Sequence, residues 1–230
     1  AMVERYVRDK VNTIDLCPNG HIAYWDCTSA PLRAFRHANK QECPQCGVSR
    51  YVMVKTRYGM QRKARAKMYY LGVGRYFQDM FRQPDIAVKL DYNQGGKHPG
   101  SIKNSRGFHE KVWSNPVMAA DGRNQAVIAT ADGVPLFKDM SARKGHPFML
   151  RTANGGEHLQ KDLYKAHLFG YIPCETWDAA ADGTAERIVG APASLQPMMV
   201  VFADEMYRLY EEGMMIEDFS RPKSDPHRWF

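Results

Sequence analysis

A pair of cysteines three positions apart most constrains what this chain can fold into. Cys43 and Cys46 stand in the run Glu-Cys-Pro-Gln-Cys-Gly, a turn that points two thiolates at one spot and suits a tetrahedral metal such as zinc. A second tight turn comes earlier, Cys17-Pro-Asn-Gly-His21, with a soft ligand at each end. The loop between the turns is of ordinary length for a zinc site. The two turns therefore predict the two knuckles of a zinc ribbon.

Other ligands and other uses of cysteine remain open at this point. Cys27 and His37 lie between the two turns and are alternative ligands for the first knuckle. A redox Cys-x-x-Cys opens a helix, whereas residues 48–54 have the composition of a strand, so zinc is favoured. A disulfide framework is disfavoured because five cysteines are an odd number and no apolar signal segment precedes them. Cys174, in an apolar stretch, is interpreted as a small buried hydrophobe.

Length and composition predict a soluble protein with a packed core. The chain has 230 residues, of which 44% are hydrophobic, enough for one large domain or for a small module beside a medium one. No apolar run approaches the roughly 20 residues that a membrane-spanning helix needs. An intracellular protein with reduced cysteines and no membrane partner is expected.

The net charge of +7 favours a polyanionic partner. Residues 55–67 contain six basic residues and no acidic one. Tyrosines flank or interrupt this segment, so basic groups could neutralise phosphates while aromatic faces stack on bases. A solvated basic face without a partner is the alternative. The predicted nucleic-acid-binding residues are Lys55, Arg57, Arg62, Lys63, Arg65 and Lys67.

Hydrophobic spacing in the amino-terminal half predicts strands and then helices. Residues 3–15 are expected to form a strand that pairs with residues 21–25, and residues 48–56 a strand that closes the ribbon. Helical spacing follows in residues 69–90, where Pro84 begins a short second helix carrying Ile86, Val88 and Leu90. Residues 93–100 are a loop by composition, and residues 105–114 are expected to form a helix with Phe108, Val112 and Trp113 inward.

The carboxy-terminal half predicts an antiparallel meander and a closing helix. Strands are expected at residues 125–131, 147–152 and 164–172, separated by connections that contain Gly and Asp. Residues 195–212 form an amphipathic helix that stops at Gly213. Its methionines are interpreted as core packing. The shared apolar face is expected to comprise Leu195, Met198, Met199, Phe202, Met206, Leu209 and Tyr210.

Asp132 is the residue singled out for chemistry. It follows the apolar run 125–131, and a carboxylate at the end of a central strand must pair or bind a cation to offset its desolvation. Three antiparallel strands with such an Asp on the first, followed by a helix, match the opening of an RNase H-like fold. There the Asp holds Mg²⁺, and two metals clamp the attacking and leaving oxygens of a phosphodiester. The alternative is plain, because Asp-Gly is a common turn dipeptide.

Several segments, in order, resemble the transposase of CACTA (En/Spm)-type DNA transposons and the related Kyakuja–Dileera–Zisupton group. The likeness covers residues 15–218, and the shared order of the segments carries it. The matching pieces are Cys17-Pro-Asn-Gly-His21, Cys43-Pro-Gln-Cys-Gly-Val-Ser-Arg-Tyr51, Tyr76-Phe77 with Met80-Phe81, Asp121-Gly-Arg-Asn124 leading into Ile128-Ala-Thr-Ala-Asp-Gly-Val-Pro-Leu-Phe137, and Leu195-Gln-Pro-Met198 followed by Asp204-Glu-Met-Tyr-Arg-Leu209.

The resemblance implies a ligand set and part of an active site. The zinc ligands would be Cys17, His21, Cys43 and Cys46, with His21 where many relatives have Cys. Asp132 would be the first acid of a DDE-type site that uses Mg²⁺. The remaining acids of relatives lie beyond position 230, and Asp204, Glu205 and Asp218 match no catalytic motif. The chain is therefore expected to be a piece of a longer transposase or a shortened, domesticated descendant, with little or no nuclease activity.

The expected fold class is α+β: a small zinc-ribbon module, a helical segment, and a partial RNase H-like antiparallel sheet with a carboxy-terminal helix. The predicted parts are residues 3–58 (ribbon), 59–123 (basic segment and helical linker), 124–218 (partial RNase H-like core) and 219–230 (tail). Removal of zinc is expected to unfold residues 15–56 and to spare residues 124–212.

The expected function is that of a transposase-derived nuclear protein that binds DNA, with RNA as the alternative nucleic acid. Further partners are a second copy of the chain or the remaining transposase domains. The competing hypotheses are a non-catalytic chromatin-binding module and a zinc-ribbon protein that assembles other proteins.

Overall fold

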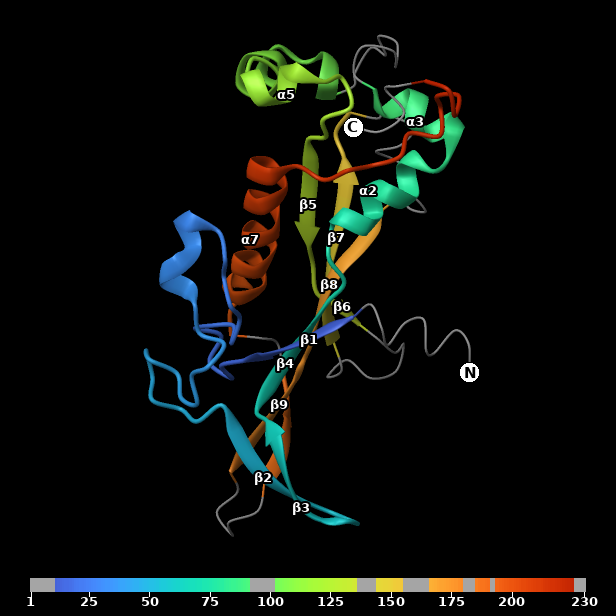
Figure 1. Ribbon diagram of the computed structural model, residues 1–230. Coiled ribbons are helices and arrows are strands. Elements are labelled where there is room, and N and C mark those ends of the chain that lie inside the picture. Colours follow the sequence, from blue (N-terminus) through green and yellow to red (C-terminus); the bar gives the residue numbers. More distant parts are fainter. Residues whose placement is uncertain are drawn as a thin grey trace. The chain divides into compact units, whose positions relative to one another are not determined.

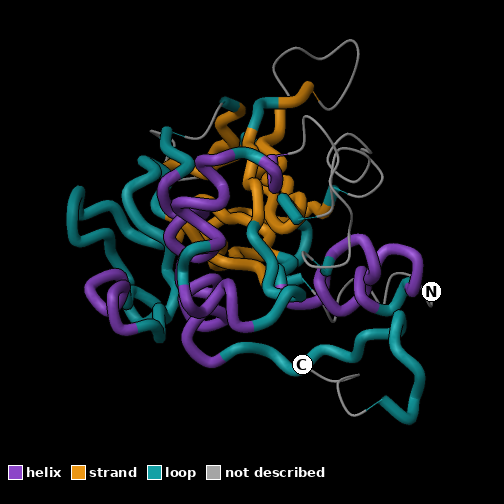
Figure 2. Tube along the Cα trace, turned by 90° about the horizontal axis from the view of Figure 1, so that it is seen from above, coloured by secondary structure: helices purple, strands orange, loops and turns teal. Residues whose placement is uncertain are grey.

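The computed structural model describes residues 11–91, 102–135, 144–154, 166–179, 185–190 and 193–225. Figure 2 distinguishes its helices, strands and loops. Helices are combined with antiparallel sheets, as the predicted α+β class requires. The predicted loop at residues 93–100 lies outside the described residues.

The chain folds into two compact units whose segments alternate along the sequence. The first unit comprises residues 1–72, 131–148 and 169–212, and the second comprises residues 73–130, 149–168 and 213–230. Strands β7 (Lys144–Thr152) and β8 (His167–Pro173) each continue from one unit into the other. The four consecutive parts expected from the sequence remain a prediction.

The sheet of the first unit begins with β1 (Asn12–Leu16), which pairs antiparallel with β4 (Ala66–Tyr70). Strand β4 then pairs with β8 through Tyr69–Tyr171 and Tyr70–Gly170, and β7 is the next neighbour of β8 (Figure 1). The short β6 (Val134–Pro135) pairs with β7. The predicted pairing of residues 3–15 with residues 21–25 is confirmed only at its end, where Leu16 and Ala23 form an antiparallel bridge and the N–H of Tyr24 donates to the carbonyl of Asp15 at 2.9 Å.

Helix α7 (Gln196–Glu212) packs directly on β8 in the first unit. A Cβ atom at Gly170 would lie 2.6 Å from Cε of Met198, so glycine permits this close approach. The rings of Phe169 and Phe202 contact each other in a tilted arrangement, with centroids 4.6 Å apart. The helix ends before Gly213, whose φ is +71°. The predicted helix is confirmed, but Met199 and Tyr210 are exposed, since the buried face turns toward Met198, Val201 and Phe202.

Two hairpins complete the first unit. Strand β2 (Tyr51–Thr56) confirms the strand predicted at residues 48–56, and it pairs with β3 (Gly59–Ala64), which the sequence reading missed. Strands β9 (Glu175–Ala179) and β10 (Ala185–Val189) form the second hairpin, also unpredicted. Strand β2 contacts both β9 and β10, so the hairpins run side by side (Figure 1).

The second unit is mainly helical. Helices α2 (Gly74–Phe81) and α3 (Pro84–Leu90) confirm the predicted pair, although Val88 is exposed because Ile86, Ala87 and Leu90 form the buried face. The helix predicted at residues 105–114 is confirmed as α4 (Arg106–Phe108) continuing into the π-helical η3 (His109–Trp113). Of the three side chains expected to face inward, Phe108 is buried, whereas Val112 and Trp113 are only half-buried. The remaining elements are η2 (Ile102–Asn104), α5 (Pro116–Ala120) and β5 (Val127–Ala131), which neighbours β7.

A buried ionic cluster holds the last described segment in the second unit. Arg123 is 5% exposed and pairs with Asp121 at 2.6 Å and with the buried Asp218 at 3.6 Å. The guanidinium of Arg123 lowers the pKa of the Asp121 carboxyl. Phe219 donates its backbone N–H to the carbonyl of Phe81 at 3.0 Å. The Asp-Gly-Arg-Asn segment and Asp218 therefore have a structural use in this fold.

Candidate metal centre

Two turns of similar construction carry the cysteine and histidine residues. Each is closed by an antiparallel bridge between the residues that flank it, Leu16–Ala23 in the first and Glu42–Ser49 in the second. In each, the N–H of the first cysteine donates to the carbonyl five residues later, at 3.0 Å from Cys17 and 2.9 Å from Cys43. Gly20 and Gly47 have φ values of +68° and +70°, which glycine adopts without steric cost. The backbone of each turn thus presents its side chains toward one point.

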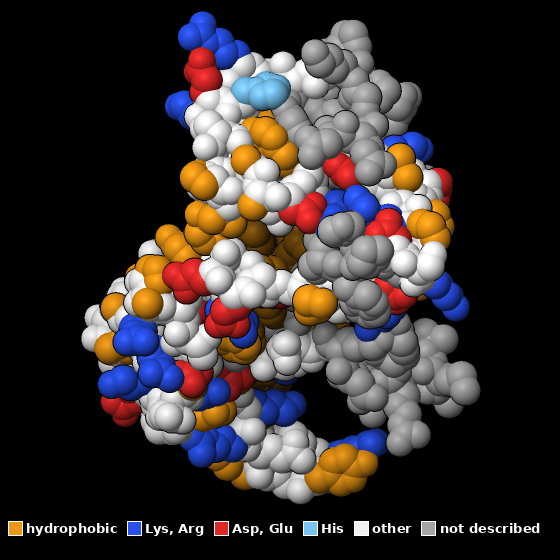
Figure 3. Space-filling model, turned by 45° about the horizontal axis from the view of Figure 1, so that its top comes forward, with side chains coloured by type: hydrophobic (Ala, Val, Ile, Leu, Met, Phe, Trp, Pro, Cys, Tyr) orange, Lys and Arg blue, Asp and Glu red, His pale blue; other side chains and the backbone are white. Residues whose placement is uncertain are grey.

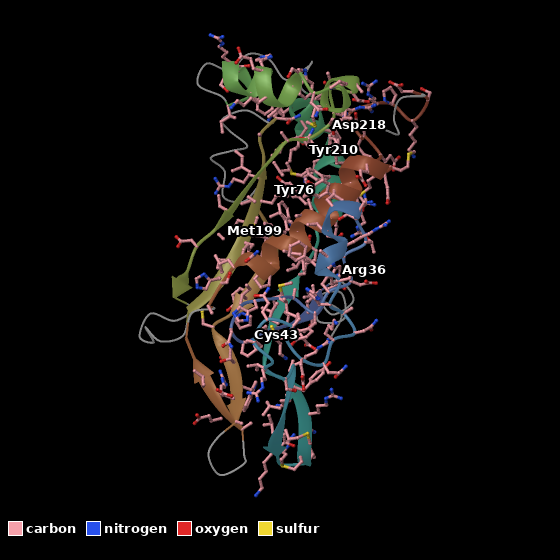
Figure 4. All side chains as sticks on the ribbon, turned by 90° about the vertical axis from the view of Figure 1, so that its left-hand side faces the viewer. Arg36, Cys43, Tyr76, Met199, Tyr210 and Asp218 are labelled. Carbon is pink, nitrogen blue, oxygen red and sulfur yellow. The ribbon has the colours of Figure 1, made fainter. Side chains whose placement is uncertain are left out.

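The ligand atoms of Cys17, His21, Cys43 and Cys46 converge, all within 4.8 Å of one another. The Sγ atoms of Cys17 and Cys46 lie 3.6 Å apart. Nδ1 of His21 lies 3.8 Å from Sγ of Cys17 and 3.7 Å from Sγ of Cys43. Figure 4 labels Cys43, which lies just above the β2–β3 hairpin in that view.

These separations fit a tetrahedral metal site and not a disulfide. Ligands placed about 2.3 Å from a central Zn²⁺ in a tetrahedron are separated by about 3.8 Å, close to the separations found here. A disulfide joins its sulfurs at about 2.0 Å, and all five cysteines are free. Three thiolates and one imidazole would fill all four coordination positions of a tetrahedral zinc ion. A site with no position left for water or substrate is typical of structural zinc.

Burial and hydrogen bonding act differently on the thiols. Burial raises the pKa of Cys17 to about 12, because the charged form loses its hydration. Burial also opposes ionisation of Cys46, but hydrogen bonds from the N–H of Val48 and from the Cys43, His21 and Asn19 side chains lower its pKa to about 6. A dication among these atoms would favour the thiolate form of each cysteine.

Three supporting residues were missed in the sequence reading. Asn19 donates from Nδ2 to Sγ of Cys46 at 3.6 Å. Tyr24 packs in the same buried cluster, and burial, with the neighbouring Cys17 and Cys43, raises its pKa to about 12. Arg50 lies 4.6 Å from the Tyr24 ring centroid and pairs with Asp15 at 2.7 Å. Their signal in the sequence was only their position inside or beside the turns.

Contacts join the first turn and the loop after it to α7. A Cβ atom at Gly20 would lie 2.5 Å from the backbone N of Ser194, just before the helix. Asp204, 1% exposed on α7, accepts hydrogen bonds from Nε1 of Trp25 at 3.2 Å and from the N–H groups of Thr28 at 3.0 Å and Ser29 at 2.9 Å. Burial disfavours the charged form of Asp204, but these hydrogen bonds outweigh that effect and hold the pKa of its carboxyl below the usual value.

The alternative ligands lie outside the converging group. Cys27 is fully buried, and burial, with the nearby Asp204, raises its pKa to about 11. His37, before the second turn, has a pKa lowered by burial. Neither belongs to the group of four, which is the one such group found among the described residues. Cys174 is buried, as expected.

The six predicted nucleic-acid-binding residues do not share one face. Lys55, Arg57 and Arg62 are exposed on the β2–β3 hairpin, and Lys67 is exposed on β4. Lys63 instead lies 5.2 Å from the Trp177 ring centroid, and Arg65 pairs with Asp178 at 2.5 Å. Four of the six cations are thus exposed, although Arg62 donates a hydrogen bond to Oε1 of Gln41 at 2.5 Å and lies 3.9 Å from the Tyr51 ring centroid. The other two are engaged by β9.

Asp132 lies in an environment different from the predicted one. Strand β5 is the last strand in the sheet order among the described strands, not a central one, and three of its five residues are exposed. Asp132 is itself exposed and accepts a hydrogen bond from the N–H of Gly133 at 2.7 Å. The desolvation argument for a bound cation therefore fails. Within the described residues, Asp132 belongs to no group of acidic, His or Cys side chains close enough together to bind one metal ion.

Comparison of the chain with known protein families, with curated protein sequences and with solved structures finds no match. None of the helices in the described residues is both long and apolar enough to cross a membrane.

Proposed function

We propose that Cys17, His21, Cys43 and Cys46 hold one structural Zn²⁺ in a ribbon-like module. The observation that supports this most is the mutual approach of the four ligand atoms within 4.8 Å, at separations close to a tetrahedron edge. A bound Zn²⁺ supplies no redox chemistry. It cross-links the two turns, and its binding free energy becomes folding free energy.

The zinc-anchored module serves nucleic-acid binding in this proposal. The chain has no acidic residue between Glu42 and Asp79, and this stretch folds into β2, β3 and β4, beginning just after the second turn. Its exposed cations can contact phosphates, and the counterions that this contact releases favour association. DNA is the proposed partner, with RNA as the alternative nucleic acid.

Kinship with CACTA-type transposases is part of the same proposal. The order of the matching segments along the chain supports it. Asp132 would be the first of the DDE acids. One exposed carboxylate cannot hold two metal ions, so cleavage would require carboxylates beyond those gathered in the described residues.

Nucleic-acid binding should be steeply dependent on salt. Four exposed cations that contact phosphates imply a loss of about a hundredfold in affinity between about 50 and about 200 mM salt. Fluorescence anisotropy of a labelled duplex with the zinc-loaded full chain measures this slope. No measurable affinity at the lowest salt concentration would contradict the nucleic-acid proposal and leave the zinc proposal standing.

The second candidate function is assembly of other proteins. Helix α7 exposes Met199 (40%), Tyr207 (42%) and Tyr210 (48%), and side chains of this type are enriched at protein interfaces. If the chain keeps a protein bound at high salt and shows no affinity for nucleic acid at low salt, this second function is favoured over the first.

A further inference from the structure

The β2–β3 hairpin has two faces with different surroundings. Its antiparallel register pairs Tyr51 with Ala64, Met53 with Arg62 and Lys55 with Met60 on one face. Because side chains alternate along a strand, the intervening pairs point to the opposite face. Burial distinguishes the two faces.

The inner face is closed by the neighbouring hairpin. Val54 is 4% exposed, and Lys63 lies against the Trp177 ring of β9. Strand β2 contacts β9 and β10, and Arg65, just after β3, is fixed by its ion pair with Asp178. This face packs against the core of the first unit at Val54, and among its side chains only that of Gln61, near the turn, is exposed.

The outer face is open and combines cations with large apolar side chains. Met53 is 46% exposed and Met60 52%, while Lys55 and Arg62 are exposed beside them. At the turn, Tyr58 is 74% exposed, with the guanidinium of Arg57 at 4.5 Å from its ring centroid. Figure 3 shows hydrophobic and basic side chains side by side on the strand pair at the lower end of the view.

From these two faces we infer that the outer face of the β2–β3 hairpin enters the major groove of duplex DNA as a two-stranded ribbon. This inference rests on the proposed nucleic-acid binding and specifies its geometry. A groove about 12 Å wide admits two antiparallel strands. The outer-face cations would meet phosphates at the groove edges, and the methionines would meet thymine methyl groups and base edges on its floor.

Charge complementarity selects this occupant over an apolar peptide. Exposed methionines alone would suit a protein, but each one is opposite or diagonal to a cation in the register, and the hairpin contains no acid. A-form RNA presents a deep, narrow major groove that side chains cannot read, and a single strand offers no groove. The inference therefore separates duplex DNA from other polyanions of equal charge.

Two lysines of the hairpin provide a matched pair for the test. Lys55→Met removes a charge from the outer face, and Lys63→Met removes the same charge from the inner face while keeping an apolar stem against Trp177. With the zinc-loaded full chain and a random-sequence duplex, we expect Lys55→Met to weaken binding about fivefold and to reduce the salt slope by about one. Lys63→Met should change affinity by less than about twofold, and thermal unfolding should show both variants folded.

Comparing a DNA duplex with a single strand and with an RNA duplex separates the ribbon inference from the more general proposal of nucleic-acid binding. We expect the DNA duplex to bind more tightly than either the matching single strand or an RNA duplex of equal length, and a minor-groove ligand to leave that binding intact. Equal effects of the two lysine variants, or equal affinity for single strand and duplex, would overturn the ribbon inference while nucleic-acid binding stood. Absence of binding to every polymer at low salt would overturn both.

Discussion

Replacing Cys43 by Ser is expected to unfold the first unit and to abolish zinc binding. Structural zinc contributes on the order of 10 kcal/mol in small peptides, comparable to the whole stability of about 5–15 kcal/mol of an ordinary domain. The sequence predicted loss confined to residues 15–56. The structure instead places the turns in one compact unit with β4, β8 and α7, so their loss should be shared.

Hydrogen exchange of the Cys43→Ser variant tests this extent directly. We expect faster exchange not only in the turns but also in β1, β4 and α7, because Gly20 packs against Ser194 and Asp204 caps the following loop. Cys27→Ser is the matched control, since it makes the same chemical change at a buried cysteine outside the group. Undisturbed protection of α7 in Cys43→Ser would show the turns to be an independent module.

Asp204→Ala is expected to cost about 3 kcal/mol of unfolding free energy, because it leaves Nε1 of Trp25 and two backbone N–H groups without an acceptor. Asp204→Asn keeps one acceptor oxygen and should lose less. Both variants should retain zinc, since Asp204 lies outside the ligand group.

Urea unfolding of the zinc-loaded protein at neutral pH measures the effect of Asp204. Glu211→Ala is the control, because it removes a carboxylate from an exposed position on the same helix and should shift stability by less than about 0.5 kcal/mol. If Asp204→Ala unfolds at the same urea concentration as Glu211→Ala, the buried carboxylate does not join the loop to α7.

Local patterns predicted local structure well. The spacing of Tyr76, Phe77, Met80 and Phe81 identified α2, and the ligand types with their glycines identified the converging group. Both patterns are written into consecutive residues, where backbone geometry decides which side chains meet. The structure brings together the four ligands that the resemblance implied, and it leaves out Cys27 and His37.

Long-range partners could not be predicted from the same patterns. Nothing in residues 12–16 indicates that β4 would pair with the whole strand and residues 21–25 only with its end, because strand pairing depends on tertiary context. Asp204 matched no motif in the sequence, yet its carboxylate is buried and accepts hydrogen bonds from three donors in residues 25–29. Asp132 shows the converse, since an apolar run before it suggested a central strand where β5 is the last in the order.

The atoms that surround the metal bound to the purified protein test the central proposal most directly. X-ray absorption at the zinc edge of the full chain should show one zinc per chain with three sulfur neighbours at about 2.3 Å and one nitrogen at about 2.0 Å. Cys43→Ser should lose this signature, and Cys27→Ser should keep it. A protein that purifies without zinc and binds none when it is supplied, or a shell made only of oxygen and nitrogen, would contradict the proposal.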